Sequence, residues 1–139
     1  MKKLFFLIFA LLLVNCQYGQ KAQGDDYQAE FAKSISHKLL SSQKEGGFYK
    51  LNEEEATQRM VEGLNEAIQK ETYKKIKQAI GHYKSLELDT VFQIKQDKSY
   101  QVYRFKGNFE SKKKVEIRTV LDLEGQLAGF FVVPWIEGF

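Results

Sequence analysis

Two histidines, His37 and His82, are the only imidazoles in the chain and the first candidates for acid–base chemistry, because their ring titrates near neutral pH. Apolar residues around His37 recur every four positions, which places it on the polar side of a predicted helix. His82 follows Gly81, where the spacing of apolar residues changes from that of a helix to that of a strand. We therefore expect His82 to make structural hydrogen bonds in a turn. Ser41 and Lys44 match the Ser-x-x-Lys spacing of some serine enzymes, but the companion motifs are missing. The sequence predicts no catalytic residue.

Metal and cofactor motifs are also missing from the sequence. With two histidines and the single Cys16, no dense set of zinc ligands can be written. There is no phosphate-binding Gly-Lys-Ser/Thr loop, no Gly-x-Ser-x-Gly elbow and no His-Glu-x-x-His helix. Asp89, Asp97, Glu116 and Asp122 fit turns or outward strand positions, so none is predicted to work as a buried acid. We expect no metal and no cofactor.

The N-terminus has the pattern of an export signal. Lys2 and Lys3 precede an uncharged run, Leu4 to Val14, that stops at Asn15 and Cys16. The run is about eleven residues, whereas a helix needs about 20 to cross a bilayer, so it predicts a processing signal. The two lysines supply most of the formal net charge of +3. The remainder is close to neutral, which argues against a nucleic-acid partner.

The residues Leu13-Val14-Asn15-Cys16 resemble the lipobox of bacterial lipoproteins, although Asn15 replaces the usual Gly, Ala or Ser. The resemblance implies cleavage before Cys16 and a diacylglycerol thioether on its sulfur, giving a membrane-anchored protein of the cell envelope. The alternative is ordinary secretion as a soluble or periplasmic protein, with cleavage near Gly19 or Ala22. We therefore expect a signal peptide over residues 1–15, a polar flexible tether over 16–25 and one domain over 26–139.

The first half of that domain predicts helices. Apolar residues spaced four apart predict a helix over residues 26–44, which Gly46-Gly47 ends. Asn52 followed by an acidic run predicts the N-cap of a second helix that begins at Glu53. Thr72 is the predicted cap of a third helix, which Gly81 ends. Since no second cysteine could form a disulfide, packing must supply the stability.

The second half changes to a period of two beyond Ser85, which predicts antiparallel strands joined by tight turns. The last strand, 127–133, is apolar on both sides, so we expect it in the centre of the sheet until Pro134 ends its pairing. Helices followed by a meander of strands predict an α+β fold.

A known family resembles this arrangement. The segments Gly81-His-Tyr-Lys-Ser85 and Asp122-Leu-Glu-Gly-Gln-Leu-Ala-Gly-Phe-Phe131, with Pro134, look like those of the bacterial domain of unknown function 3887. The resemblance implies a nuclear transport factor 2-like, cystatin-like cone, in which a curved antiparallel sheet wraps helices around a pocket. It also implies export and frequent lipid attachment, and it carries no catalytic residues to this chain. His82 and Tyr83 are the candidates for the pocket mouth.

The C-terminal aromatic segment is the remaining candidate for function. The segment is predicted to belong to a covered central strand; otherwise, Trp135, Ile136 and Phe139 form an exposed apolar interface. We expect a non-catalytic domain that binds a small apolar ligand or associates with itself or another envelope protein. The alternative is a small hydrolase or isomerase with an acid or base inside the cone, where His82 or Tyr83 would be tested first. Whether the chain is an enzyme stays open.

Overall fold

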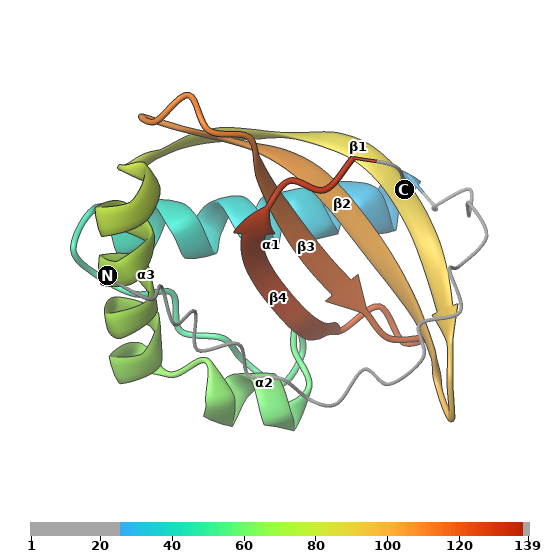
Figure 1. Ribbon diagram of the computed structural model, residues 1–139. Coiled ribbons are helices and arrows are strands. Elements are labelled where there is room, and N and C mark those ends of the chain that lie inside the picture. Colours follow the sequence, from blue (N-terminus) through green and yellow to red (C-terminus); the bar gives the residue numbers. More distant parts are fainter. Residues whose placement is uncertain (1–25, 138–139) are drawn as a thin grey trace.

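The computed structural model describes residues 26–137, so Cys16, Phe139 and the predicted signal and tether lie outside the described residues. Helices pack against a four-stranded antiparallel sheet, which confirms the α+β prediction (Figure 1). The elements in chain order are α1 (Asp26–Lys44), α2 (Gln58–Gly63), α3 (Glu66–Ile80), β1 (Tyr83–Lys95), β2 (Ser99–Phe109), β3 (Val115–Leu121) and β4 (Leu127–Pro134). No helix among them is long and apolar enough to cross a membrane.

Helix α1 has the predicted bounds. Ala32, Ile35, Leu39 and Leu40 form one apolar stripe, and each is at most 1% exposed. Burial of such a stripe, rather than intrinsic propensity, supplies most of the stability of a helix. The chain leaves α1 through Gly46, whose φ of 85° suits a residue without a Cβ.

The predicted start of the second helix is wrong. The side chain of Asn52 does accept hydrogen bonds from the backbone N–H groups of Glu54 and Glu55, but it caps a single turn. The chain then becomes extended, because Ala56 forms a parallel bridge with Leu127 at the start of β4. Helix α2 begins only after Thr57, whose hydroxyl accepts a hydrogen bond from the N–H of residue 60. Long-range pairing therefore overrides the local capping signal.

The predicted start of the third helix is wrong as well. Its N-cap is Asn65, whose side chain accepts from the N–H of Ile68, so Thr72 lies inside α3. The predicted end is confirmed, since Gly81 is the C-cap. Its backbone, at φ 81° and ψ −166°, lies in a region that only glycine adopts readily.

The strands run in the spatial order β1-β2-β3-β4, each antiparallel to its neighbour. Strand β4 is therefore an edge strand, which corrects the prediction that it lies centrally. Its apolar residues are used on both sides for another reason: Phe130 and Val132 pack against the core, whereas Phe131 points to the opposite face. The outer edge of β4 is hydrogen-bonded at its first residue, because the N–H of Leu127 donates to the carbonyl of Glu55.

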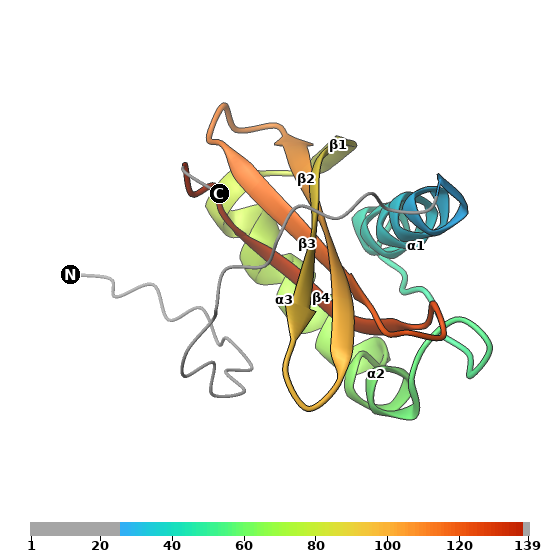
Figure 2. The same ribbon diagram turned by 90° about the vertical axis from the view of Figure 1, so that its right-hand side faces the viewer.

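The core lies between α1, α3 and one face of the sheet (Figure 2). Among the described residues, the buried members of this core run from Ala32 to Leu127 in sequence. Tyr103, Phe105 and Ile117 come from the central strands and are fully buried. Strand side chains alternate between faces, so the residues next to these three on their strands point to the other face of the sheet. We call the side opposite α1 the outer face.

Candidate functional site

The outer face carries a cluster of charged residues on the two central strands. Arg104 lies between Tyr103 and Phe105 on β2, and Arg118 is its partner across the β2–β3 ladder. Glu116, two residues before Arg118, points to the same face. Two of these three side chains are removed from water: Glu116 is fully buried and Arg104 is 2% exposed. Buried charges are costly unless they are paired, so their partners decide what the cluster can do.

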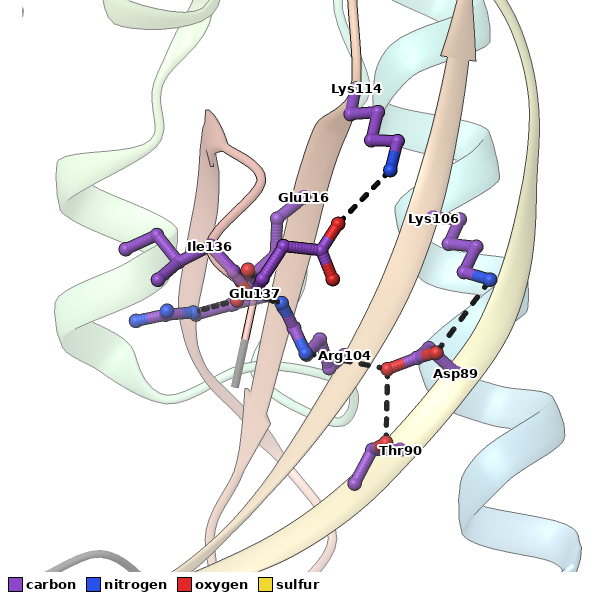
Figure 3. A network of polar contacts seen from close by, with 9 residues as sticks. Asp89, Thr90, Arg104, Lys106, Lys114, Glu116, Ile136 and Glu137 are labelled. Atoms are coloured by element: carbon purple, nitrogen blue, oxygen red, sulfur yellow. Dashed lines mark hydrogen bonds and ion pairs between the residues drawn. The ribbon is translucent and has the colours of Figure 1, made fainter. Parts of the chain in front are cut away.

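Glu116 is held between two guanidinium groups (Figure 3). The Nε of Arg104 lies 3.0 Å from Oε2 of Glu116, in an ion pair that lacks the alignment of a hydrogen bond. The Nε of Arg118 donates a hydrogen bond to Oε1. A second acid offsets the excess positive charge, because Asp89 on β1 lies 3.5 Å from Arg104 and 3.9 Å from Lys106.

The chain beyond β4 folds over this cluster. We call residues 135–137 the C-terminal arm. The Trp135 ring lies over the Arg104 guanidinium, with 3.7 Å from its centroid to Cζ, and the carbonyl of Ile136 accepts a hydrogen bond from Nη2 of Arg104. Glu137 and Lys114 form an ion pair at 3.0 Å, which fixes the end of the arm to the start of β3 (Figure 3). Stacking and charge together hold the arm against the sheet.

This arrangement suits anchoring better than catalysis. Both carboxylate oxygens of Glu116 face guanidinium groups, so neither is presented to a substrate. Arg104 is covered by the Trp135 ring. A general acid or base must reach the proton that it transfers, and these groups are enclosed by one another. What the cluster does is to position Trp135 and Ile136 on the outer face.

The structure separates His82 from Tyr83, the two candidates for a pocket mouth. Tyr83 is 1% exposed, packs edge-on against Phe109 and shares a hydrogen bond of 2.9 Å with Nδ1 of His37. Burial raises the pKa of Tyr83 to about 12. His82 is half-buried and lies 3.1 Å from the hydroxyl of Tyr73. Tyr83 is thus part of the core, and His82 lines a surface groove instead.

The space between α1 and the sheet is filled by aromatic side chains. Tyr83, Tyr103, Phe105 and Phe109 are each at most 5% exposed. Two hollows of about 230 and 300 Å³ occur on the described part of the molecule, and both open to the surface. Residues 26–137 contain no group of three or more His, Cys, Asp or Glu side chains placed to hold a metal ion.

Sequence reasoning placed Glu116 at the solvent, which is wrong. Arg104 was not recognised as buried either. Both residues alternate with core residues, a pattern that normally indicates a solvated strand face. Their burial could not be predicted from this pattern, because the covering Trp135 comes from a distant segment. Of the three predicted interface residues, Trp135 is half-buried, Ile136 is 51% exposed and Phe139 lies outside the described residues.

Comparisons of the chain with family models, curated proteins and solved structures find no match. The sequence resemblance to the bacterial domain of unknown function 3887 therefore remains a prediction, and the function must be argued from the site itself.

Proposed function

We propose that this chain is an exported, lipid-anchored protein of the cell envelope whose cone-like α+β domain is a non-catalytic association module. Its partner is a second copy of the same chain, bound through the outer face. The anchor part of the proposal rests on the lipobox-like residues that end at Cys16.

Exposed apolar side chains around the charged cluster carry the association proposal. Phe131 is 40% exposed and Ile136 is 51% exposed. Phe92 and Val120, from β1 and β3, are half-buried on the same face. Apolar patches rimmed by polar groups mark protein contacts more often than chance. The filled interior also favours association at the surface over binding of an apolar ligand inside the cone.

The strand register supports a second copy as the partner. In a face-to-face dimer whose two-fold axis follows β2, strand β1 of one copy lies opposite β3 of the other. Asp89 lies in the β1 bulge beside Arg104. The partner of Arg104 on β3 is Arg118, so Asp89 of each copy would face Arg118 of the other. In the next row, Phe92 aligns with Val120 through Val102. Charge and apolar rows are thus both self-complementary.

The association is tested with two variants that introduce the same new charge in different places. Phe131→Glu should shift the mass measured by light scattering from dimer to monomer, because a carboxylate would be desolvated at the interface. Leu123→Glu is the matched control: Leu123 is 75% exposed in the β3–β4 turn, away from the outer face. A wild-type monomer at every concentration, or a dimer that persists in Phe131→Glu, would overturn the proposal.

The anchor is tested separately on the full chain. Cys16→Ala should abolish incorporation of labelled fatty acid in the producing cells, whereas export should continue. Labelling that persists without the thiol would refute lipidation at Cys16 and leave the association part standing.

A further inference from the structure

A basic groove lies on another side of the molecule, between the end of α1 and helix α3. It has a volume of about 230 Å³ and opens to the surface. Its charged and polar lining comes from Gln43, Lys44, Lys70, Lys74, Lys77, Tyr73 and His82. Three of the four lysines come from one face of α3, since positions 70, 74 and 77 are spaced by four and three residues.

Most of this positive charge is not neutralised. Lys70 pairs with Glu66 at 2.6 Å. Among residues 26–137, no carboxylate lies within ion-pairing distance of Lys44, Lys74 or Lys77. Like charges three or four residues apart destabilise a helix, so their alignment on one face has a cost.

Helix capping explains only part of the pattern. Lys44 and Lys77 are in the last turns of α1 and α3, where a cation interacts favourably with the helix dipole. That preference does not account for Lys74, nor for the position of all four lysines around one hollow. An anionic ligand would account for both.

His82 adds a directional donor to the groove. The hydroxyl oxygen of Tyr73 accepts a hydrogen bond from the backbone N–H of Tyr83 at 3.2 Å. Its own proton is then best placed on Nδ1 of His82, 3.1 Å away, which makes that nitrogen an acceptor. In this neutral tautomer, assigned from the hydrogen bonds, Nε2 of His82 carries the proton. Lysine residues and a histidine with an N–H group therefore line the same groove.

The basic region continues onto the loop between β2 and β3. The N–H of Ser111 donates to the carbonyl of Ile80 at the end of α3, and this places the exposed Lys112 and Lys113 at the same end of the molecule (Figure 1). One acid, Glu110, lies at this junction, with its carboxylate beside Gly81. It leaves the region with a net positive charge.

We propose that this groove binds a phosphate group, with the lysines supplying charge and His82 an oriented donor. Phosphate could come from a phospholipid headgroup or from a soluble phosphorylated molecule. The proposal does not depend on lipidation or on dimerisation, because no lining residue of the groove belongs to the lipobox-like segment or to the outer face of the sheet.

The test uses the chain from Asp26 to Phe139, which contains every helix and strand that the structure describes, with its fold checked by circular dichroism. Sodium pyrophosphate is titrated calorimetrically, and flotation is measured with vesicles of phosphatidylcholine alone or mixed equally with phosphatidylglycerol. The double variant Lys74→Gln, Lys77→Gln should bind about thirtyfold more weakly, because each lysine near an anionic surface contributes a factor of about five. The matched control is Lys95→Gln, Lys98→Gln in the β1–β2 hairpin, at the far end of the molecule (Figure 1).

Pyrophosphate binding that the groove variant weakens and the control retains supports the proposal with a soluble source. The same difference seen only with phosphatidylglycerol vesicles supports it with a lipid source. His82→Ala should weaken either interaction further. If the wild-type chain binds neither probe at low salt, or if both lysine pairs lower binding equally, the proposal is wrong.

Discussion

The Arg104 guanidinium lies between a fully buried carboxylate, Glu116, and the face of the Trp135 ring. One side chain thereby links the centre of the sheet to the C-terminal arm. Since a cation stacked on tryptophan contributes about 0.5–2 kcal/mol, Arg104 helps to hold the arm in place. Any change that alters the charge balance under Trp135 should be felt in stability first.

Glu116→Gln should lower the free energy of unfolding by about 3–5 kcal/mol, because it removes the closer countercharge of the buried Arg104 and leaves only Asp89 at 3.5 Å. Urea unfolding followed by circular dichroism would measure the change. Glu137→Gln is the matched control, since it removes a carboxylate from the same neighbourhood but from an exposed ion pair with Lys114. Equal stability of the Glu116→Gln variant and wild type would show that the buried pair is not needed.

Gly81→Ala should lower the free energy of unfolding by roughly 1–3 kcal/mol, through its backbone conformation alone. A Cβ at this position would also lie 2.7 Å from the Cβ of Glu110, so the helix-to-sheet junction must shift. Thermal unfolding would measure the loss. Gly63→Ala, at the end of α2, is the comparison: it has no atom within 4 Å of its added Cβ and should be neutral or stabilising. Similar melting temperatures for the two variants would contradict the assignment of strain to Gly81.

Ser36 and Thr119 join α1 to β3 through hydroxyl groups 2.5 Å apart, and both residues are fully buried. Ser36→Ala should cost about 1–3 kcal/mol of unfolding free energy, because the Thr119 hydroxyl then lacks its partner. Adding Thr119→Val should recover part of that loss, which a double-mutant cycle would detect. Ser34→Ala, on the exposed side of the same helix, should have no measurable effect. Additive effects of the two buried changes would argue against coupling.

Local periodicity predicted the parts of the fold that local forces determine. The bounds of α1 follow from its apolar stripe, and Gly81 ends α3 where the sequence indicates. The start of α2 could not be obtained in this way, because Ala56 pairs with Leu127, far along the chain. The capping pattern at Asn52 is real but is satisfied within one turn.

The candidate site was less predictable for the same reason. Arg104 and Glu116 occupy alternate strand positions that usually face water. They are buried because Trp135 returns across the sheet, and nothing in the spacing of β2 or β3 indicates that cover. Trp135 and Ile136 were predicted to matter, although their contact with a buried arginine was not.

Tyr83 gives the domain an alkaline limit to its stability. Its pKa is about 12 in the folded state, against 10.0 for an ordinary tyrosine, because burial disfavours the phenolate. The unfolded chain therefore loses this proton from about pH 10, whereas the folded chain keeps it until about pH 12. The contribution is complete below pH 10 and falls as pH rises towards 12, by about 2–3 kcal/mol for two pH units.

Tyr83→Phe should make the free energy of unfolding less steep between pH 10 and 12, at a cost of about 1 kcal/mol at neutral pH for the lost hydrogen bond to His37. Burial also raises the pKa of Tyr73, so part of the alkaline loss should remain in this variant. Tyr27→Phe removes a hydroxyl from a side chain that is 78% exposed and should keep the wild-type slope. Urea unfolding at a series of pH values separates the three chains. If Tyr83→Phe retains the full alkaline loss, another buried group must carry the proton linkage.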